Sequence, residues 1–123
     1  MTLSDLLDQL NIDQDALLKR FSGNDKLIEH FLHKFPQDAT FIQLENAIAQ
    51  CDWDASLVAV HTLKGIAGNF GMERLYSACS NMLILLRSGD SVQDQAAREF
   101  TAVRQEYMHI LECIEQWGKI EIG

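Results

Sequence analysis

A histidine, a lysine and two glycines share a helical spacing between residues 61 and 68. On a helix that turns about 100° per residue, His61, Lys64, Gly65 and Gly68 gather on one face. An imidazole near neutral pH offers an unprotonated nitrogen that can act as a nucleophile. A lysine three residues away can place its charge over the same spot and stabilise an anion attached to the ring. The pattern therefore indicates a site that could carry a transient phosphoryl group.

The two glycines are unusual on the solvent-facing side of a helix. Each costs roughly 1 kcal/mol relative to alanine in a helix interior, so stability does not explain their presence. A glycine does leave a flat surface that another backbone or a bulky group can approach closely. We expect Gly65 and Gly68 to clear space around His61 in this way. Leu57 and Val58 are apolar and lie off the predicted core face, which suggests that a partner docks here.

The opposite face of the same segment is apolar and should point into a core. Asp52 and Asp54 precede it and suit the positive N-terminal end of a helix dipole, so we expect a helix from there to about Asn69. The predicted core face consists of Val60, Leu63, Ile66, Ala67 and Phe70, with Ala59 at its margin.

The rest of the chain also has helical periodicity, without strand-like alternation. Pro36 should kink or restart one helix because proline removes a backbone donor, and Asn24 is a plausible N-cap after a break at residues 22–24. Residues 88–91 (Ser-Gly-Asp-Ser) indicate a turn. The remaining apolar stripes are Leu3, Leu6, Leu7 and Leu10; Ala16 to Phe21; Leu27, Ile28, Phe31, Leu32 and Phe35; Phe41, Leu44 and Ile48; Met72, Leu75, Tyr76, Cys79, Met82, Leu83 and Leu86; and Phe100, Val103, Tyr107, Ile110, Ile114 and Trp117.

These stripes and their short connections predict an all-α protein. We expect an antiparallel four-helix bundle, with one or two short N-terminal helices acting as a lid. With 123 residues the chain is long enough for one core, so residues 1–123 should form a single domain.

Charge and composition exclude several classes of function. The formal net charge is −8, which argues against nucleic-acid binding and against an anionic membrane surface, since both need basic residues. No apolar run approaches the roughly 20 residues that span a bilayer, and the N-terminus lacks the basic start of a secretion signal. We therefore expect a cytoplasmic protein without membrane insertion. The three cysteines, Cys51, Cys79 and Cys113, lie among apolar residues and are interpreted as buried thiols.

Two weaker patterns could suggest metal binding. His30 and His33 are three residues apart, but no nearby Cys or carboxylate completes a site by sequence. Glu106 and His109 form a single Glu-x-x-His, whereas di-iron bundles need a second copy and further inward glutamates. We therefore expect no metal site.

The segment from His61 to Gly71, HTLKGIAGNFG, resembles the signature of histidine-containing phosphotransfer (HPt) domains of two-component phosphorelays. Residues 19–24 (KRFSGN) and 31–36 (FLHKFP) resemble the sequence that usually precedes it in this family. The pair Asp52-Trp53 before the histidine also fits. Leu75, Cys79 and Met82 after it fall where the family has similar residues, so the resemblance extends from about Asn11 to Trp117.

The resemblance implies a phosphorelay carrier. His61 would accept the phosphoryl group, Lys64 would support it electrostatically, and Gly65 would admit the partner. The partner would be the receiver domain of a response regulator or hybrid sensor kinase, which supplies the aspartate, the acidic pocket and Mg²⁺. The chain itself would need no cofactor. Because it has no Gly-rich nucleotide loop, it should lack ATP-dependent kinase activity of its own.

Two residues depart from the family pattern. Ile66 replaces a common Ala or Ser, and its position on the helix points it toward the core. Leu83 stands where many members carry Glu or Gln near the histidine, so we expect no hydrogen bond to the imidazole from there.

Two other functions stay open at this point. One is a helical module that binds a receiver or kinase without being phosphorylated, and the other is a metal-binding bundle. The sequence fits both a free-standing carrier and a domain of a larger sensor kinase. We expect a monomer, because one copy already presents the whole site.

Overall fold

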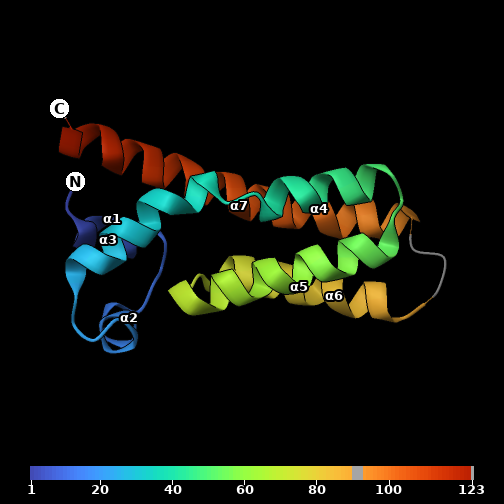
Figure 1. The fold of residues 1–123 in the computed structure, drawn as a ribbon, viewed down its shortest axis with the longest axis horizontal. Helices are drawn as coiled ribbons and strands as arrows, with labels where there is room; N and C mark the ends of the chain where they lie inside the picture. The colour runs from blue at the N-terminus through green and yellow to red at the C-terminus, as the bar shows by residue number, and fades with distance from the viewer. Residues whose placement is uncertain (90–92, 123) are drawn as a thin grey trace.

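Four long helical segments run antiparallel along one axis, with two short helices at one end (Figure 1). The computed structural model describes residues 1–89 and 93–122, and every regular element within these ranges is a helix. In chain order the elements are α1 (Leu3–Gln9), α2 (Gln14–Arg20), α3 (Asp25–Lys34), η1 (Phe35–Gln37), α4 (Thr40–Ala49), α5 (Trp53–Phe70), α6 (Glu73–Arg87) and α7 (Gln93–Ile122).

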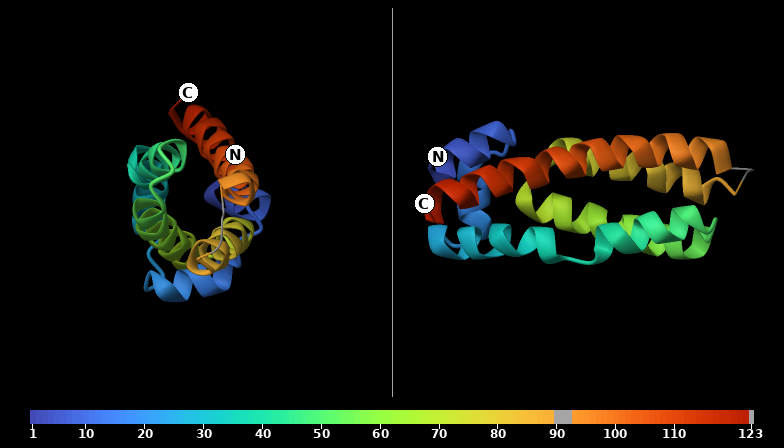
Figure 2. Two further views of the ribbon diagram at one scale, coloured as in Figure 1. Left: turned by 90° about the vertical axis from the view of Figure 1, so that its right-hand side faces the viewer. Right: turned by 90° about the horizontal axis from the view of Figure 1, so that it is seen from above.

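The first arm of the bundle is made of two helices placed end to end. α3 and α4 follow one another along the same side, as the right-hand view of Figure 2 shows. Pro36 lies in the short 3-10 turn η1 between them, so the predicted restart at the proline is confirmed. Seen down the long axis, α4, α5, α6 and α7 form a ring in which α5 packs between α4 and α6, and α7 packs against both α6 and α4 (Figure 2).

The two N-terminal helices cover the end of the bundle near both termini (Figure 1). α1 packs against α7, and α2 packs against α5. The predicted fold class, an all-α bundle with a short helical lid, is confirmed. No helix in the described part of the chain is both long and apolar enough to cross a membrane.

The helix ends follow the capping signals in the sequence. The carboxylate of Asp52 accepts a hydrogen bond from the amide of Ala55 at 3.1 Å, so the predicted helix of residues 52–69 begins one residue after this cap. Asn24 caps α3 in the same way, as predicted. α5 ends at Phe70, and the next residue, Gly71, has a φ of 72°, the left-handed conformation that glycine adopts without strain.

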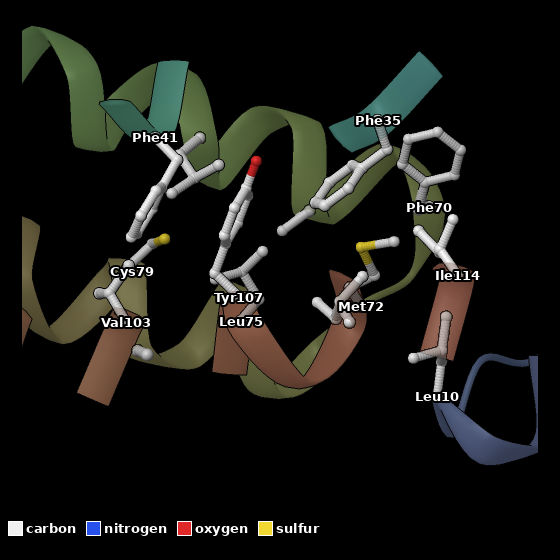
Figure 3. Packing of buried hydrophobic residues seen from close by; sticks show 14 of the residues in the cluster. Leu10, Phe35, Phe41, Phe70, Met72, Leu75, Cys79, Val103, Tyr107 and Ile114 are labelled. Carbon is white, nitrogen blue, oxygen red and sulfur yellow. The ribbon is translucent and has the colours of Figure 1, made fainter. Parts of the chain in front are cut away.

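The core is continuous and rich in aromatic rings (Figure 3). The rings of Phe41 and Tyr107 stack with centroids 4.1 Å apart, and Phe35 contacts both Tyr107 and Phe70. These contacts join α4, α5 and α7, so the helix that carries His61 is anchored on its apolar side. Burial raises the pKa of Tyr107, and the nearby charge of Asp38 adds to the effect.

Several residues of the predicted apolar stripes and thiols lie at the surface, among them Leu27 and Phe31, which are 38% and 41% exposed. Cys51 is exposed, because it occupies the turn after α4 with a φ of 54°, whereas Cys79 and Cys113 are buried as expected. Tyr76 is 42% exposed because it lies at the margin of the α6 stripe that faces α5. Of the predicted turn at residues 88–91, Ser88 and Gly89 follow the end of α6, and the remainder lies outside the described residues.

Candidate functional site

His61 lies near the middle of α5, on the side that faces away from the core. The side chain is exposed, whereas Val60, Leu63 and Ala67 on the opposite side of the helix are fully or almost fully buried. α5 therefore positions His61 through its buried face: the core fixes the helix, and the helix fixes the direction of the imidazole. The prediction that His61 and the core residues point in opposite directions is confirmed.

The two glycines of the His61 face differ in what lies above them. Among the residues that the structure describes, a Cβ atom added at Gly65 would have no neighbour within 4 Å, so the space one turn beyond His61 is open. A Cβ atom added at Gly68 would lie 3.4 Å from Cε2 and 3.5 Å from Cδ2 of Tyr76. Gly65 thus leaves open space next to His61, whereas Gly68 lies in contact with an aromatic ring from α6.

Lys64 extends toward the same ring. Its ammonium nitrogen lies 5.2 Å from the centroid of the Tyr76 ring, which is within the range of a cation–π contact. Among the described residues, this ammonium group forms no ion pair or hydrogen bond. Burial raises the pKa of the Cys79 thiol on α6 to about 12, and the positive charge of Lys64 acts in the opposite direction. Lys64 therefore carries a positive charge three residues from His61 on α5, and this charge lies against the ring of Tyr76.

The other predicted site residues are apolar and occupy the margins of the face. Val58 is 66% exposed, and its carbonyl oxygen accepts a hydrogen bond from the Thr62 hydroxyl at 3.0 Å. Leu57 is half-buried and packs partly against the core, so less of it is available to a partner. Ile66 also packs against the core, and Leu83 is 2% exposed within it.

Arg20 from the lid is bound to the end of the histidine helix. Its guanidinium donates hydrogen bonds of 2.6 Å to the backbone oxygens of Gly68 and of Asn69. The oxygen of Gly68 also accepts a hydrogen bond from the amide of Gly71 at 3.2 Å, so Arg20 adds a second donor there and brings a positive charge to the carbonyl end of the helix, where the dipole favours it. Arg20 therefore fixes the C-terminal end of α5 to α2.

Two open hollows flank Arg20, with volumes of about 490 and 410 Å³. Tyr76 lines the first, and Phe31 and Ile66 line the second. His61 is exposed and lines neither of these two hollows. A small ligand bound in either of them would therefore not lie against the imidazole.

Sequence reasoning missed Arg20 and Tyr76 as parts of this site. Arg20 stands 48 residues from Gly68, and the only local signal was a basic residue at the end of a predicted helix. Tyr76 belongs to the apolar stripe of α6, but its position at the edge of that stripe on a helical wheel is the signal for a ring at the surface.

The other histidines lie away from the His61 face. The ring of His33 stacks on Trp117 with centroids 4.3 Å apart, and His30 has an edge-to-face contact with Phe31. His109 lies 3.8 Å from the sulfur of Cys113. Within residues 1–89 and 93–122, no group of three or more His, Cys, Asp or Glu side chains is arranged to hold a metal ion.

Comparison with known proteins identifies the family. The family model described as Hpt domain matches residues 26–118, which is most of the chain and includes all of α4, α5 and α6. Neither the search of curated proteins nor the search of solved structures found a match. Hpt domains are the phosphotransfer carriers of two-component phosphorelays and interact with receiver domains. The matched region contains the exposed histidine, its lysine and the open glycine, and the chain belongs to the Hpt domain family.

Proposed function

We propose that this chain carries a phosphoryl group on His61 and exchanges it with the aspartate of a receiver domain. The observation that carries the proposal is the exposed imidazole beside the open space above Gly65. A receiver must bring its phosphoaspartate to within bonding distance of a ring nitrogen. A bare glycine one turn away allows that approach, whereas a larger side chain would stand in its path.

The proposed transfer conserves atoms and charge. An unprotonated ring nitrogen of His61 attacks the phosphorus of the aspartyl phosphate. The bond between phosphorus and the carboxylate oxygen breaks, and the aspartate leaves as a carboxylate. The other ring nitrogen keeps its proton, so the product is a phosphorylated imidazolium. The reverse sequence returns the group to an aspartate.

Phosphoryl transfer of this kind depends on in-line positioning and on neutralising the charge of the moving group. We assign the first task to α5, which holds His61 outward, and part of the second to Lys64. The remaining neutralisation is expected from Mg²⁺ in the acidic pocket of the receiver, since we assign no metal ligands to the His61 face. When bound there, the ion would draw negative charge from the phosphoryl oxygens.

We also propose that the chain is a carrier without kinase activity of its own. Its family consists of phosphotransfer carriers. The His61 face is open, and the two hollows beside Arg20 exclude the imidazole, so a nucleotide bound in either would not lie against it. We expect one copy of the chain to act as a monomer, and Val58 and the exposed part of Leu57 to contact the receiver at the edge of the site.

The test is transfer from a receiver domain carrying labelled phosphoaspartate. Wild-type protein should gain a label that is labile in acid and stable in alkali, which is the behaviour of phosphohistidine. His61→Gln should gain none. His30→Gln is the matched control, because His30 is an exposed histidine on α3 and its replacement should leave labelling unchanged.

A binding measurement separates the carrier from a module that only docks. His61→Gln should still bind the receiver, since the substitution leaves the surrounding face intact. If wild type binds the receiver but takes no label, the chain acts as a binding module instead. Equal labelling of wild type and His61→Gln would show that the phosphoryl acceptor is another residue.

A further inference from the structure

The ammonium group of Lys64 lies over the ring of Tyr76. We propose that Tyr76 is a positioning residue. It holds Lys64 to one side while His61 is unphosphorylated, and Lys64 leaves the ring and contacts the phosphoryl group once His61 is phosphorylated. This inference rests on the proposed function of His61. It assigns a role to a residue of α6, and it makes the support from Lys64 conditional on phosphorylation.

The positions along α5 indicate the direction in which Lys64 is held. With a rise of about 1.5 Å per residue, Lys64 stands about 4.5 Å beyond His61 along the helix axis, and Gly68 about 10.5 Å beyond it. The Tyr76 ring packs against Gly68. A helical side chain normally covers the turn on the N-terminal side of its own Cα, which for Lys64 is the turn of His61. The ring therefore attracts the ammonium group toward the opposite end of the face.

The ring lies directly beside Gly68. A Cβ atom added at Gly68 would meet two carbons of the ring at 3.4 and 3.5 Å, which is van der Waals contact, so the ring covers α5 closely at this position. In the described residues the Tyr76 side chain makes no hydrogen bond through its hydroxyl, so the contact depends on the ring alone. Gly68, Tyr76 and Lys64 thus form a connected set beside His61.

The contact is weak enough to be broken by a phosphoryl group. An exposed cation–π pair corresponds to a factor of about two to five in an equilibrium constant, or about 0.5–1 kcal/mol. A phosphoryl group carries up to two negative charges and attracts an ammonium group more strongly. Phosphorylation must therefore first overcome the contact with Tyr76, which lowers the stability of the phosphohistidine by that same factor.

The test compares the equilibrium of phosphoryl exchange with a receiver in four variants. Tyr76→Leu should raise the ratio of phosphorylated to free protein two- to fivefold, because Lys64 no longer has a competing partner. Tyr76→Phe keeps the ring and should match wild type. Lys64→Met should lower the ratio, and adding Tyr76→Leu to it should change nothing further. An unchanged or lowered ratio in Tyr76→Leu would overturn the proposal.

Nuclear magnetic resonance gives a second measurement that needs no transfer. The ε-methylene protons of Lys64 should be shifted upfield by the ring in the unphosphorylated wild type and in Tyr76→Phe, but not in Tyr76→Leu. Absence of this shift in wild type would refute the contact whatever the transfer data show. If the shift is present but wild type takes no label, the function assigned to His61 fails while the contact stands. If label and shift are both present, the shift should diminish on phosphorylation, and its persistence would refute the release of Lys64.

Discussion

Replacing Gly65 with alanine should make the protein more stable and slower at transfer. The added methyl group meets no atom of the described residues within 4 Å, so it introduces no clash with them. Alanine at a helix-interior position is favoured over glycine by about 0.5–1 kcal/mol. For a chain of this length the entropy of unfolding is about 0.26 kcal/mol/K, so the melting temperature should rise by about 2–4 °C.

The same methyl group lies where the receiver is proposed to approach His61. A displacement of about 1 Å at the reacting atoms can cost about 100-fold in rate, and we expect a loss of 10- to 100-fold for Gly65→Ala and more for Gly65→Leu. Melting followed by circular dichroism measures the first effect, and the single-turnover rate of transfer from a phosphorylated receiver measures the second.

Gly118→Ala is the matched control for this substitution. Gly118 also lies inside a helix, and within the described residues an added Cβ would meet Cε1 of His33 at 3.8 Å, an ordinary contact. Its replacement should raise stability, by less than Gly65→Ala because it stands near the end of α7, and leave transfer unchanged. Wild-type transfer rates in Gly65→Leu would refute the argument from close approach. A fall in the melting temperature of Gly65→Ala would refute the claim that the space is open.

Three further predictions concern the lid and the thiols. Arg20→Met removes two charged hydrogen bonds at an exposed site, so it should lower the free energy of unfolding in urea by about 1–2 kcal/mol and speed amide exchange at the end of α5. The control is Lys19→Met, which replaces an exposed neighbour; an equal loss of stability in that variant would contradict the role of Arg20. Iodoacetamide at pH 8 should alkylate Cys51 well before Cys79 or Cys113, as read by mass spectrometry of peptides, and rapid loss of the Cys79 thiol would show that α6 opens readily. Burial raises the pKa of Cys79 from 9.0 to about 12, so its neutral thiol contributes stability that is complete below pH 9 and is lost as the pH rises toward 12. Urea titrations should show the free energy of unfolding fall over this pH range, and the fall should be smaller in Cys79→Ala.

The histidine helix could be predicted in detail because its signals are local. Asp52 is a capping residue followed by a helical apolar stripe, and Gly71 is the residue that a left-handed helix end favours. The exposure of His61 can be predicted from the same stripe, since a helix face that does not point into the core points toward solvent. Pro36 marked the break between α3 and α4 for an equally local reason, the loss of a backbone donor.

The parts that could not be predicted depend on which helices become neighbours. Nothing local links Arg20 to the carbonyl groups of Gly68 and Asn69, because the contact exists only once α2 has packed against α5. Tyr76 could be read as core because aromatic rings at helical spacing usually are. Its ring instead lies half-exposed at the margin of the α6 stripe, where it contacts α5 at Gly68 and Lys64.

The contact of Arg20 with the end of α5 helps to explain how this helix stays formed with two glycines in its interior. Two glycines in its interior cost about 2 kcal/mol together relative to alanine. The Asp52 cap contributes about 1 kcal/mol of stability, and the Arg20 contact at the other end of the helix contributes a similar amount. Together these two contacts offset the destabilisation caused by the glycines. If that is how the helix holds together, Arg20→Met and Gly65→Ala should compensate in the double variant. Stability would then return toward wild type while transfer stays slow, which would separate what keeps the helix formed from what lets the receiver in.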